Sequence, residues 1–183
     1  MRMAWCLGIV LLVVGCATTY TLEPAVLEMP AKPIFGPVSA YVDDGTEGNG
    51  NAWAYDVEMY DALRQSGLFS SLGTFGGSNE LIVSLNVTRN SSALPALISA
   101  ATVFVMPVPK DFDHQLLAVA RVNGQVVKTY QYSIKEKSFK PPILDPMVKD
   151  AREAISILMS HLLADLARDK PFPPTAPSAS GDQ

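Results

Sequence analysis

The sequence predicts an α+β fold, an antiparallel sheet of about four to five strands with two helices packed on one face. Three observations lead to it: alternating apolar residues over 81–88, an Asn123-Gly124 dipeptide between strand-like runs, and a long apolar stripe at helical spacing after Pro146. Strands that follow one another directly should pair antiparallel, which leaves both helices to cover one face. The expected order is β-α-β-β-β-β-α, in a domain spanning residues 38–168.

The first strand is expected at residues 38–43 and the first helix at residues 53–65. Apolar side chains recur at helical spacing in this helix, at Trp53, Val57, Tyr60 and Leu63. Gly67 should end it, because glycine accepts the left-handed backbone that closes a helix. The polar loop 43–51 does not match a calcium-binding loop, since Ala54 stands where a bidentate acid is required.

The Asn123-Gly124 dipeptide predicts a two-residue type I′ hairpin turn, because both residues accept positive φ. The expected cross-strand pairs are Val122 with Gln125, Val119 with Lys128, and Leu117 with Tyr130. Both faces of this hairpin carry apolar side chains, so either face could meet the helices.

The strongest helix is expected at the end of the domain. Asp145 is a good N-cap, and Pro146 suits the first helical position. The residues after them form an apolar stripe with steps of three and four, at Val148, Ala151, Ile155, Leu158, Leu162 and Leu166.

Residues 94–106 leave two interpretations open. Pro95 excludes a helix through the start of this segment, and the β-rich run 102–105 favours a strand that ends before Pro107. Alternatively, the segment forms an exposed apolar patch for a partner or a lipid. Its candidate contact residues are Leu94, Leu97, Ile98 and Phe104.

The first fifteen residues have the layout of a secretory signal. Arg2 precedes an apolar run over residues 7–14, which is shorter than the roughly 20 apolar residues that span a bilayer. The run ends in Val13-Val14-Gly15-Cys16. This motif resembles the lipobox of bacterial lipoproteins, in which the signal is cut before the cysteine and the thiol is joined to a diacylglycerol.

The resemblance implies cleavage between Gly15 and Cys16 and a covalent lipid anchor on Cys16, whose new amino group is usually acylated as well. Two or more acyl chains hold a protein stably on a membrane, whereas one does so only marginally. Ala17 follows the cysteine, where an aspartate favours retention at the inner membrane in similar lipoproteins. The expected location is therefore the bacterial envelope, at the outer membrane and facing the periplasm.

Two segments outside the domain are rich in proline. Residues 16–37 should form an extended linker after the lipidated cysteine, and residues 169–183 a disordered tail of proline, serine and alanine. Loss of residues 1–15 removes Arg2 and no acid, so the formal charge of −4 becomes −5. Such mild acidity argues against a nucleic-acid partner.

The sequence contains no motif for a metal, a nucleotide or a catalytic nucleophile, so we expect no cofactor, no metal site and no catalytic residue. Cleavage of the signal also removes Cys6, which leaves Cys16 as the only cysteine expected in the mature chain. His114 is expected in a turn-rich loop, and His161 beside the apolar stripe of the last helix. A hydrolase is therefore the least favoured function.

A second resemblance covers about residues 38–168. The Ser-Gly-Leu-Phe ending of the first helix, within residues 61–72, is followed by Tyr130-Gln131-Tyr132 and by Asp165-Leu166. This pattern resembles small, mostly uncharacterised bacterial lipoproteins with an α+β domain. The order of elements is also similar to periplasmic domains of lipoprotein activators and transporter auxiliary lipoproteins, which mostly bind proteins. The resemblance implies a non-catalytic accessory module that binds another envelope protein, with lipid binding or transfer as the alternative.

Overall fold

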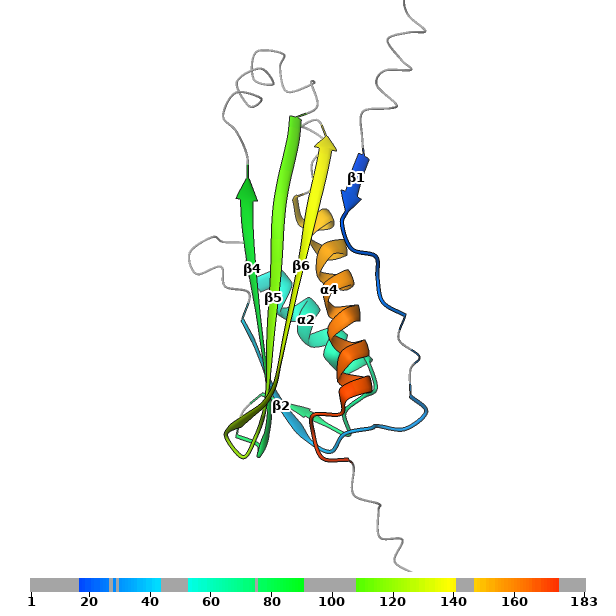
Figure 1. Ribbon diagram of the computed structural model, residues 1–183, viewed down its shortest axis with the longest axis vertical. Helices are drawn as coiled ribbons and strands as arrows, with labels where there is room; N and C mark the ends of the chain where they lie inside the picture. The colour runs from blue at the N-terminus through cyan, green and yellow to red at the C-terminus, as the bar shows by residue number, and fades with distance from the viewer. Residues whose placement is uncertain are drawn as a thin grey trace, which may run out of the picture.

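The structure is a computed structural model that describes residues 17–26, 28, 30–43, 53–74, 76–90, 108–140 and 147–174. This part of the chain forms one sheet of six strands and two helices (Figure 1). The strands are β1 (Ala17–Tyr20), β2 (Val38–Asp43), β3 (Leu72–Gly73), β4 (Asn79–Asn90), β5 (Val108–Val122) and β6 (Gln125–Lys140). The helices are α2 (Trp53–Gln65) and α4 (Met147–Asp169). None of the helices in these ranges has both the length and the apolar composition needed to cross a bilayer.

The sheet is mixed, with strand order β1-β6-β5-β4-β2-β3. The α+β class and the packing of both helices against the sheet are confirmed, but an all-antiparallel sheet of four to five strands is wrong. β2 lies parallel to β3 and β4, because α2 separates β2 from both in sequence and returns the chain to the same end of the sheet. The strand expected at residues 102–105 lies outside the described residues.

The core lies between the sheet and the two helices. Alternate residues of the central strands face it and are buried: Leu81, Val83, Leu85, Leu116, Ala118 and Ala120. The last four residues of the predicted α4 stripe pack against them, and Ile155, Leu158, Leu162 and Leu166 are all at most 2% exposed. The expected cap at Asp145 and Pro146 lies outside the described residues.

Helix α2 has the predicted bounds, but only part of its predicted stripe, Tyr60 and Leu63 among the described side chains, packs on the core. Met59 and Leu63 are fully buried, whereas Val57 is 60% exposed, so its assignment to the apolar face was wrong. Met59 and Leu63 are one turn apart and therefore lie on one side of the helix. Gly67 ends the helix region with φ 67°, as predicted.

The β5–β6 hairpin has the predicted type I′ signature, with φ 51° at Asn123 and 77° at Gly124. Val122 pairs with Gln125 as expected, but the other two predicted pairs are wrong by one residue. A β-bulge between Ala120 and Arg121 shifts the register, so that Val119 faces Thr129 and Leu117 faces Gln131. The face that carries Leu116 is the one that meets the core.

The N-terminal segment is part of the fold, which corrects the expected extended linker over residues 16–37. β1 pairs antiparallel with β6, from Ala17 opposite Phe139 to Tyr20 opposite Glu136. Further along, the Ala25 amide donates to Ser160 Oγ of α4 at 2.8 Å, and Phe35 is fully buried in the core. Apolar burial and edge-strand pairing outweigh the proline content of this segment.

The folded domain also extends beyond its expected C-terminal boundary at residue 168. α4 ends at Asp169, and the chain then turns at Lys170, where φ is 50°. Phe172 follows at 3% exposure, with its ring edge-on to that of Phe35 at a centroid distance of 5.6 Å. The first residues of the expected tail therefore pack against the core through Phe172. Residues 175–183 lie outside the described part of the chain.

Candidate functional site

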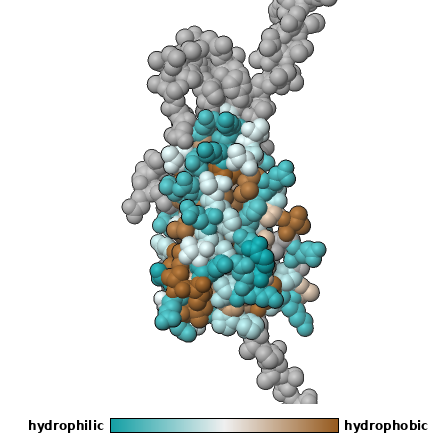
Figure 2. Space-filling model, in the orientation of Figure 1, coloured by the Kyte–Doolittle hydropathy of each residue, from teal (hydrophilic) through white to brown (hydrophobic). Residues whose placement is uncertain are grey.

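The sheet carries an exposed apolar surface on the side opposite the core. Its members come from four strands and are here called the outer patch: Tyr41, Ile82, Leu117, Val119 and Val127. Tyr41, Leu117 and Val127 are 50%, 42% and 48% exposed. Figure 2 shows hydrophobic side chains gathered at the lower left of the molecule, toward the end that carries the β5–β6 hairpin.

Strand register brings the outer patch together. Tyr41 of β2 lies opposite Ile82 of β4, and Ile82 lies opposite Val119 of β5, so three strands contribute one continuous row. Leu117 extends the row by one step along β5, because residues two apart on a strand share a face. On β6, Val126 lies opposite Arg121, the residue after core-facing Ala120, and Val127 is the residue that the bulge leaves unpaired. Both side chains are exposed, Val126 at 57% and Val127 at 48%.

The same side of the sheet becomes polar toward β1. The exposed residues there are Asn86, Thr88, Gln115, Gln131, Ser133, Lys135 and Lys137. Ser133 Oγ donates a hydrogen bond of 3.0 Å to Asp113 Oδ1 on the neighbouring strand. One face of the sheet thus divides into an apolar half at the hairpin and a polar half at the N-terminal strand.

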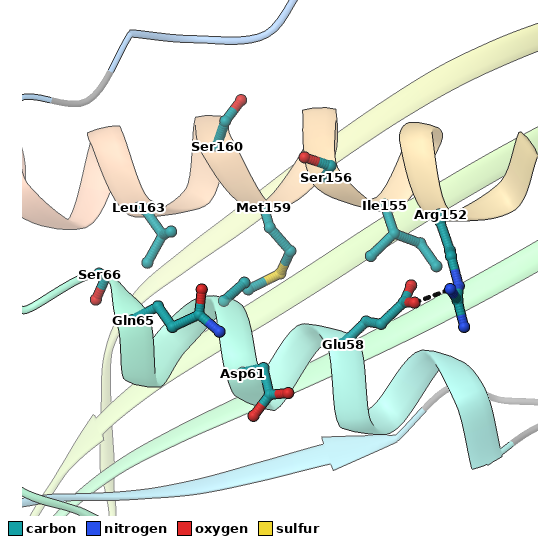
Figure 3. Close-up of a pocket in the computed structure, with 11 residues that line it drawn as sticks. Glu58, Asp61, Gln65, Ser66, Arg152, Ile155, Ser156, Met159, Ser160 and Leu163 are labelled. Atoms are coloured by element: carbon teal, nitrogen blue, oxygen red, sulfur yellow. Dashed lines mark ion pairs between the residues drawn. The ribbon is translucent and has the colours of Figure 1, made fainter. Parts of the chain in front are cut away.

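A groove of about 510 Å³ runs between α2 and α4 on the helical side of the molecule (Figure 3). Ile155, Met159 and Leu163 point from α4 toward α2, and Arg152 Nε lies 2.5 Å from Glu58 Oε1 at one end. Partial burial raises the pKa of the Glu58 carboxyl, and the Arg152 guanidinium opposes this shift.

The apolar floor of this groove is closed by its own packing. Ile155, Met159 and Leu163 are only 2%, 1% and 7% exposed, so these three side chains offer little surface to a ligand. An acyl chain gains about 25 cal/mol for each Å² of apolar surface that it buries. The exposed outer patch is therefore the better candidate for an apolar contact.

His114 lies in the middle of β5, fully inside the fold, which corrects the expected turn-rich loop. The alternation of β5 turns it to the core face beside Leu116, and its side chain is 1% exposed. Its Nε2 lies 2.9 Å from Oε2 of Glu136, which is also 1% exposed. His114 Nδ1 and Glu136 Oε1 have no hydrogen-bond partner within the described residues. This pair is buried structure, because no open surface reaches either side chain.

His161 holds the N-terminal segment against α4. Its Nε2 lies 2.8 Å from the carbonyl oxygen of Glu23, and its ring lies 6.0 Å from that of Tyr132. Tyr132 in turn donates a hydrogen bond of 2.6 Å to Asp165 Oδ2. Burial, followed by this bond to the Asp165 carboxylate, raises the pKa of Tyr132 well above its usual value. The two histidines therefore stand on different elements, each with its own structural partner.

Several residues singled out in the sequence lie outside the described part of the chain. These are the cleavage and lipidation residues Gly15 and Cys16 and the candidate patch residues Leu94, Leu97, Ile98 and Phe104. The outer patch was not predicted, although the apolar character of both hairpin faces was a partial signal. Its assembly needs the strand order, which brings Tyr41 beside residues that are far away in sequence.

No protein-family model matches this chain, and neither does any curated protein. Among solved structures, a homologue of the neuraminyllactose-binding hemagglutinin from Helicobacter pylori is similar at a TM-score of 0.50 and 12% identity, covering 80% of this chain and 90% of its own. A minor lipoprotein from Acinetobacter baumannii reaches a TM-score of 0.45 at 7% identity, covering 79% of this chain and 99% of its own. Rare lipoprotein B from Shewanella oneidensis reaches a TM-score of 0.44 at 10% identity, covering 72% of this chain and 96% of its own. At identities this low, the likeness to these proteins concerns the fold alone.

Proposed function

We propose that this chain is a lipid-anchored accessory protein of the bacterial envelope, which binds another envelope protein through the outer patch and catalyses no reaction. Its anchor is a diacylglycerol joined to the thiol of Cys16. Cleavage after Gly15 makes Cys16 the first residue of the mature chain. Its site of action is the outer membrane, on the periplasmic side. The observation that carries the binding function is the exposed apolar row across β2, β4 and β5.

The lipid anchor is supported by the sequence of residues 1–16. A single positive charge, a short apolar run and a small residue before the cysteine are the features of a signal cut at a lipobox. Cleavage would also remove Cys6, and lipidation would occupy the thiol of Cys16. The mature chain would then have no free thiol, so the folded domain would be stabilised by its apolar core and not by disulfides.

A protein is the partner that best fits the outer patch. Apolar side chains at the centre with polar residues around them are typical of protein interfaces. Here Glu80, Asp43 and Gln131 lie next to the patch in the strand register, which gives its apolar centre a polar rim. The partner surface should therefore carry apolar side chains at its centre and hydrogen-bonding or basic groups at its edge.

Site-specific photo-crosslinking in living cells tests this proposal. A photoreactive amino acid at Leu117 should give one reproducible adduct with an envelope protein, while the same probe at Lys135, on the polar half of the same face, should give none. Leu117→Asp should weaken the adduct formed from a probe at Tyr41 by about 10-fold or more, as expected for loss of a central contact.

Asn86→Asp is the matched control, because Asn86 is exposed on the polar half of the same face, opposite Gln115 and outside the rim of the patch, and is already polar. It should leave the adduct intact, and both variants should keep the urea midpoint of the parent within error. Equal adducts at Leu117 and Lys135 would contradict the proposal. An adduct at twice the mass of the chain would also contradict it, because the outer patch would then join two copies of this protein.

A further inference from the structure

We infer that the folded body stands directly on the membrane that holds its anchor, with the β1 end of the sheet against the phospholipid headgroups and the outer patch held far from them. This inference rests on the proposed lipidation of Cys16. It concerns the contact between this chain and its own bilayer, which is separate from the contact with a protein partner.

The chain leaves no slack between the anchor and the fold. β1 begins at Ala17, the residue after Cys16. One trans peptide unit separates consecutive Cα atoms by about 3.8 Å, so the first strand residue lies within a few ångströms of the acylated cysteine. β1 then continues the sheet as its edge strand, paired with β6 over its whole length.

The residues after β1 cannot supply a tether without breaking contacts. The Thr21 amide donates to the Lys135 carbonyl at 3.1 Å, and the Lys135 amide donates back to Thr21 Oγ1 at 2.9 Å. Bonds to Ser160 and His161 of α4 fix the chain further along. Each such hydrogen bond stabilises a fold by about 1 kcal/mol, so peeling this segment away carries a cost that increases with every residue released.

Among the described residues, the β1 end carries charged side chains that phospholipid headgroups can bind. Ala17 lies opposite Phe139, and Phe139 lies opposite Pro109, so the outer ends of β6 and β5 flank the anchor point (Figure 1). Lys135 and Asp111 are exposed toward the same end of β6 and β5. Charges of both signs suit phospholipid headgroups, which carry phosphate and, in phosphatidylethanolamine, an ammonium group.

The outer patch lies at the other end of the same strands. Val127 and Phe139 stand at opposite ends of β6. At about 3.3 Å per residue, the distance between them is roughly 40 Å, and Gln131, opposite Leu117, lies roughly 26 Å from Phe139. The outer patch is then held away from the lipid by a rigid sheet, and the partner should be met in the periplasm at a set distance from the membrane.

Fluorescence quenching in vesicles tests this arrangement with the full acylated protein. The acylated chain has no free thiol, so Lys137→Cys and Gln125→Cys each introduce one labelling site, at the β1 end and the hairpin end respectively. Vesicles of phosphatidylethanolamine and phosphatidylglycerol carry a nitroxide quencher on the headgroup. We expect several-fold stronger quenching of the label at 137 than of the label at 125, and equal quenching would overturn the inference.

A linker insertion is the matched control. About 12 glycine and serine residues placed between Cys16 and Ala17 span roughly 20 Å as a flexible coil. Quenching at 137 should then fall toward the value at 125, and an unchanged value would overturn the claim that chain length sets the position of the body. Failure of the anchor itself is distinguishable, because an unacylated protein would not sediment with the vesicles and neither label would be quenched.

Discussion

Tyr130 and Tyr132 lie two positions apart on the core face of β6 and differ in one hydrogen bond. Tyr132 donates to the Asp165 carboxylate, whereas the Tyr130 hydroxyl is buried without a hydrogen-bond partner among the described residues. Removing a hydroxyl that bonds an ionised group loses more free energy than removing one that bonds nothing. The sequence shows two tyrosines on one face and cannot reveal this difference, because the partner comes from α4.

Substituting the two tyrosines separates their roles. Tyr132→Phe should lower the free energy of unfolding by about 1.5–3 kcal/mol, the usual contribution of a hydrogen bond to a charged group. Tyr130→Phe should be neutral or slightly stabilising, because it removes a buried hydroxyl that lacks a partner. Urea unfolding of both variants measures the difference, and equal losses would contradict these contacts.

Both tyrosines also make stability depend on pH at the alkaline end. Burial, with the carboxylates of Asp169 and Asp165 nearby, raises the pKa of Tyr130 to about 12, and the pKa of Tyr132 is raised further. An unfolded tyrosine has a pKa near 10. The stabilisation is therefore complete below pH 10 and is lost as the pH rises toward 12. Urea midpoints should fall over this window, and the fall should be smaller in a Tyr130→Phe, Tyr132→Phe double variant.

Because His114 and Glu136 are buried and paired, we expect the effects of replacing them on the free energy of unfolding to be strongly coupled. His114→Leu or Glu136→Met alone leaves one buried polar partner unpaired and should cost about 3–5 kcal/mol. The double variant replaces the pair by apolar side chains and should cost less than the two single losses combined. A double-mutant cycle by urea unfolding measures the coupling, and additive losses would show that the two side chains do not interact.

At the scale of elements, the sequence predicts what depends on local pattern. Helix α2, the buried stripe of α4 and the Asn123-Gly124 turn follow from spacing and turn chemistry within a few residues. The parallel pairing of β2, the bulge at Ala120 and the docking of β1 depend on contacts between distant segments. Proline-rich sequence suggested a linker because its few apolar residues show no period. Phe35 is nevertheless fully buried in the core, and Tyr20, Leu22 and Ile34 pack against it.

Phe35 should therefore be essential to the N-terminal segment. Its ring lies 5.6 Å from the rings of both Phe69 and Phe172, so three separate parts of the chain meet there. Phe35→Ala should lower the free energy of unfolding by about 3–5 kcal/mol. Val26→Ala is the control, because Val26 is 90% exposed, and it should change stability by no more than about 0.5 kcal/mol. A Phe35→Ala protein as stable as its parent would show that residues 17–37 are a linker after all.

At the scale of the whole molecule, the outer face of the sheet changes from polar to apolar along its strands. Among the described residues, the outer face is polar where β1 enters the sheet and apolar toward the hairpin, roughly 26–40 Å away. An exposed apolar surface beside the anchor would suit insertion into lipid, whereas one at the far end suits a protein partner. No single stretch of sequence carries this arrangement, because the outer patch combines residues from four strands whose order the sequence leaves open.

The proposed anchor on Cys16 underlies both the proposed function and the inferred orientation of the body. Its most direct test is the intact mass, with N-terminal peptide analysis, of the protein purified from the membrane fraction of the cell that makes it. We predict a chain that begins at Cys16 and carries a thioether-linked diacylglycerol, with a further acyl group on its amino nitrogen. A chain that keeps residues 1–15, or one whose Cys16 thiol is free, would contradict the anchor.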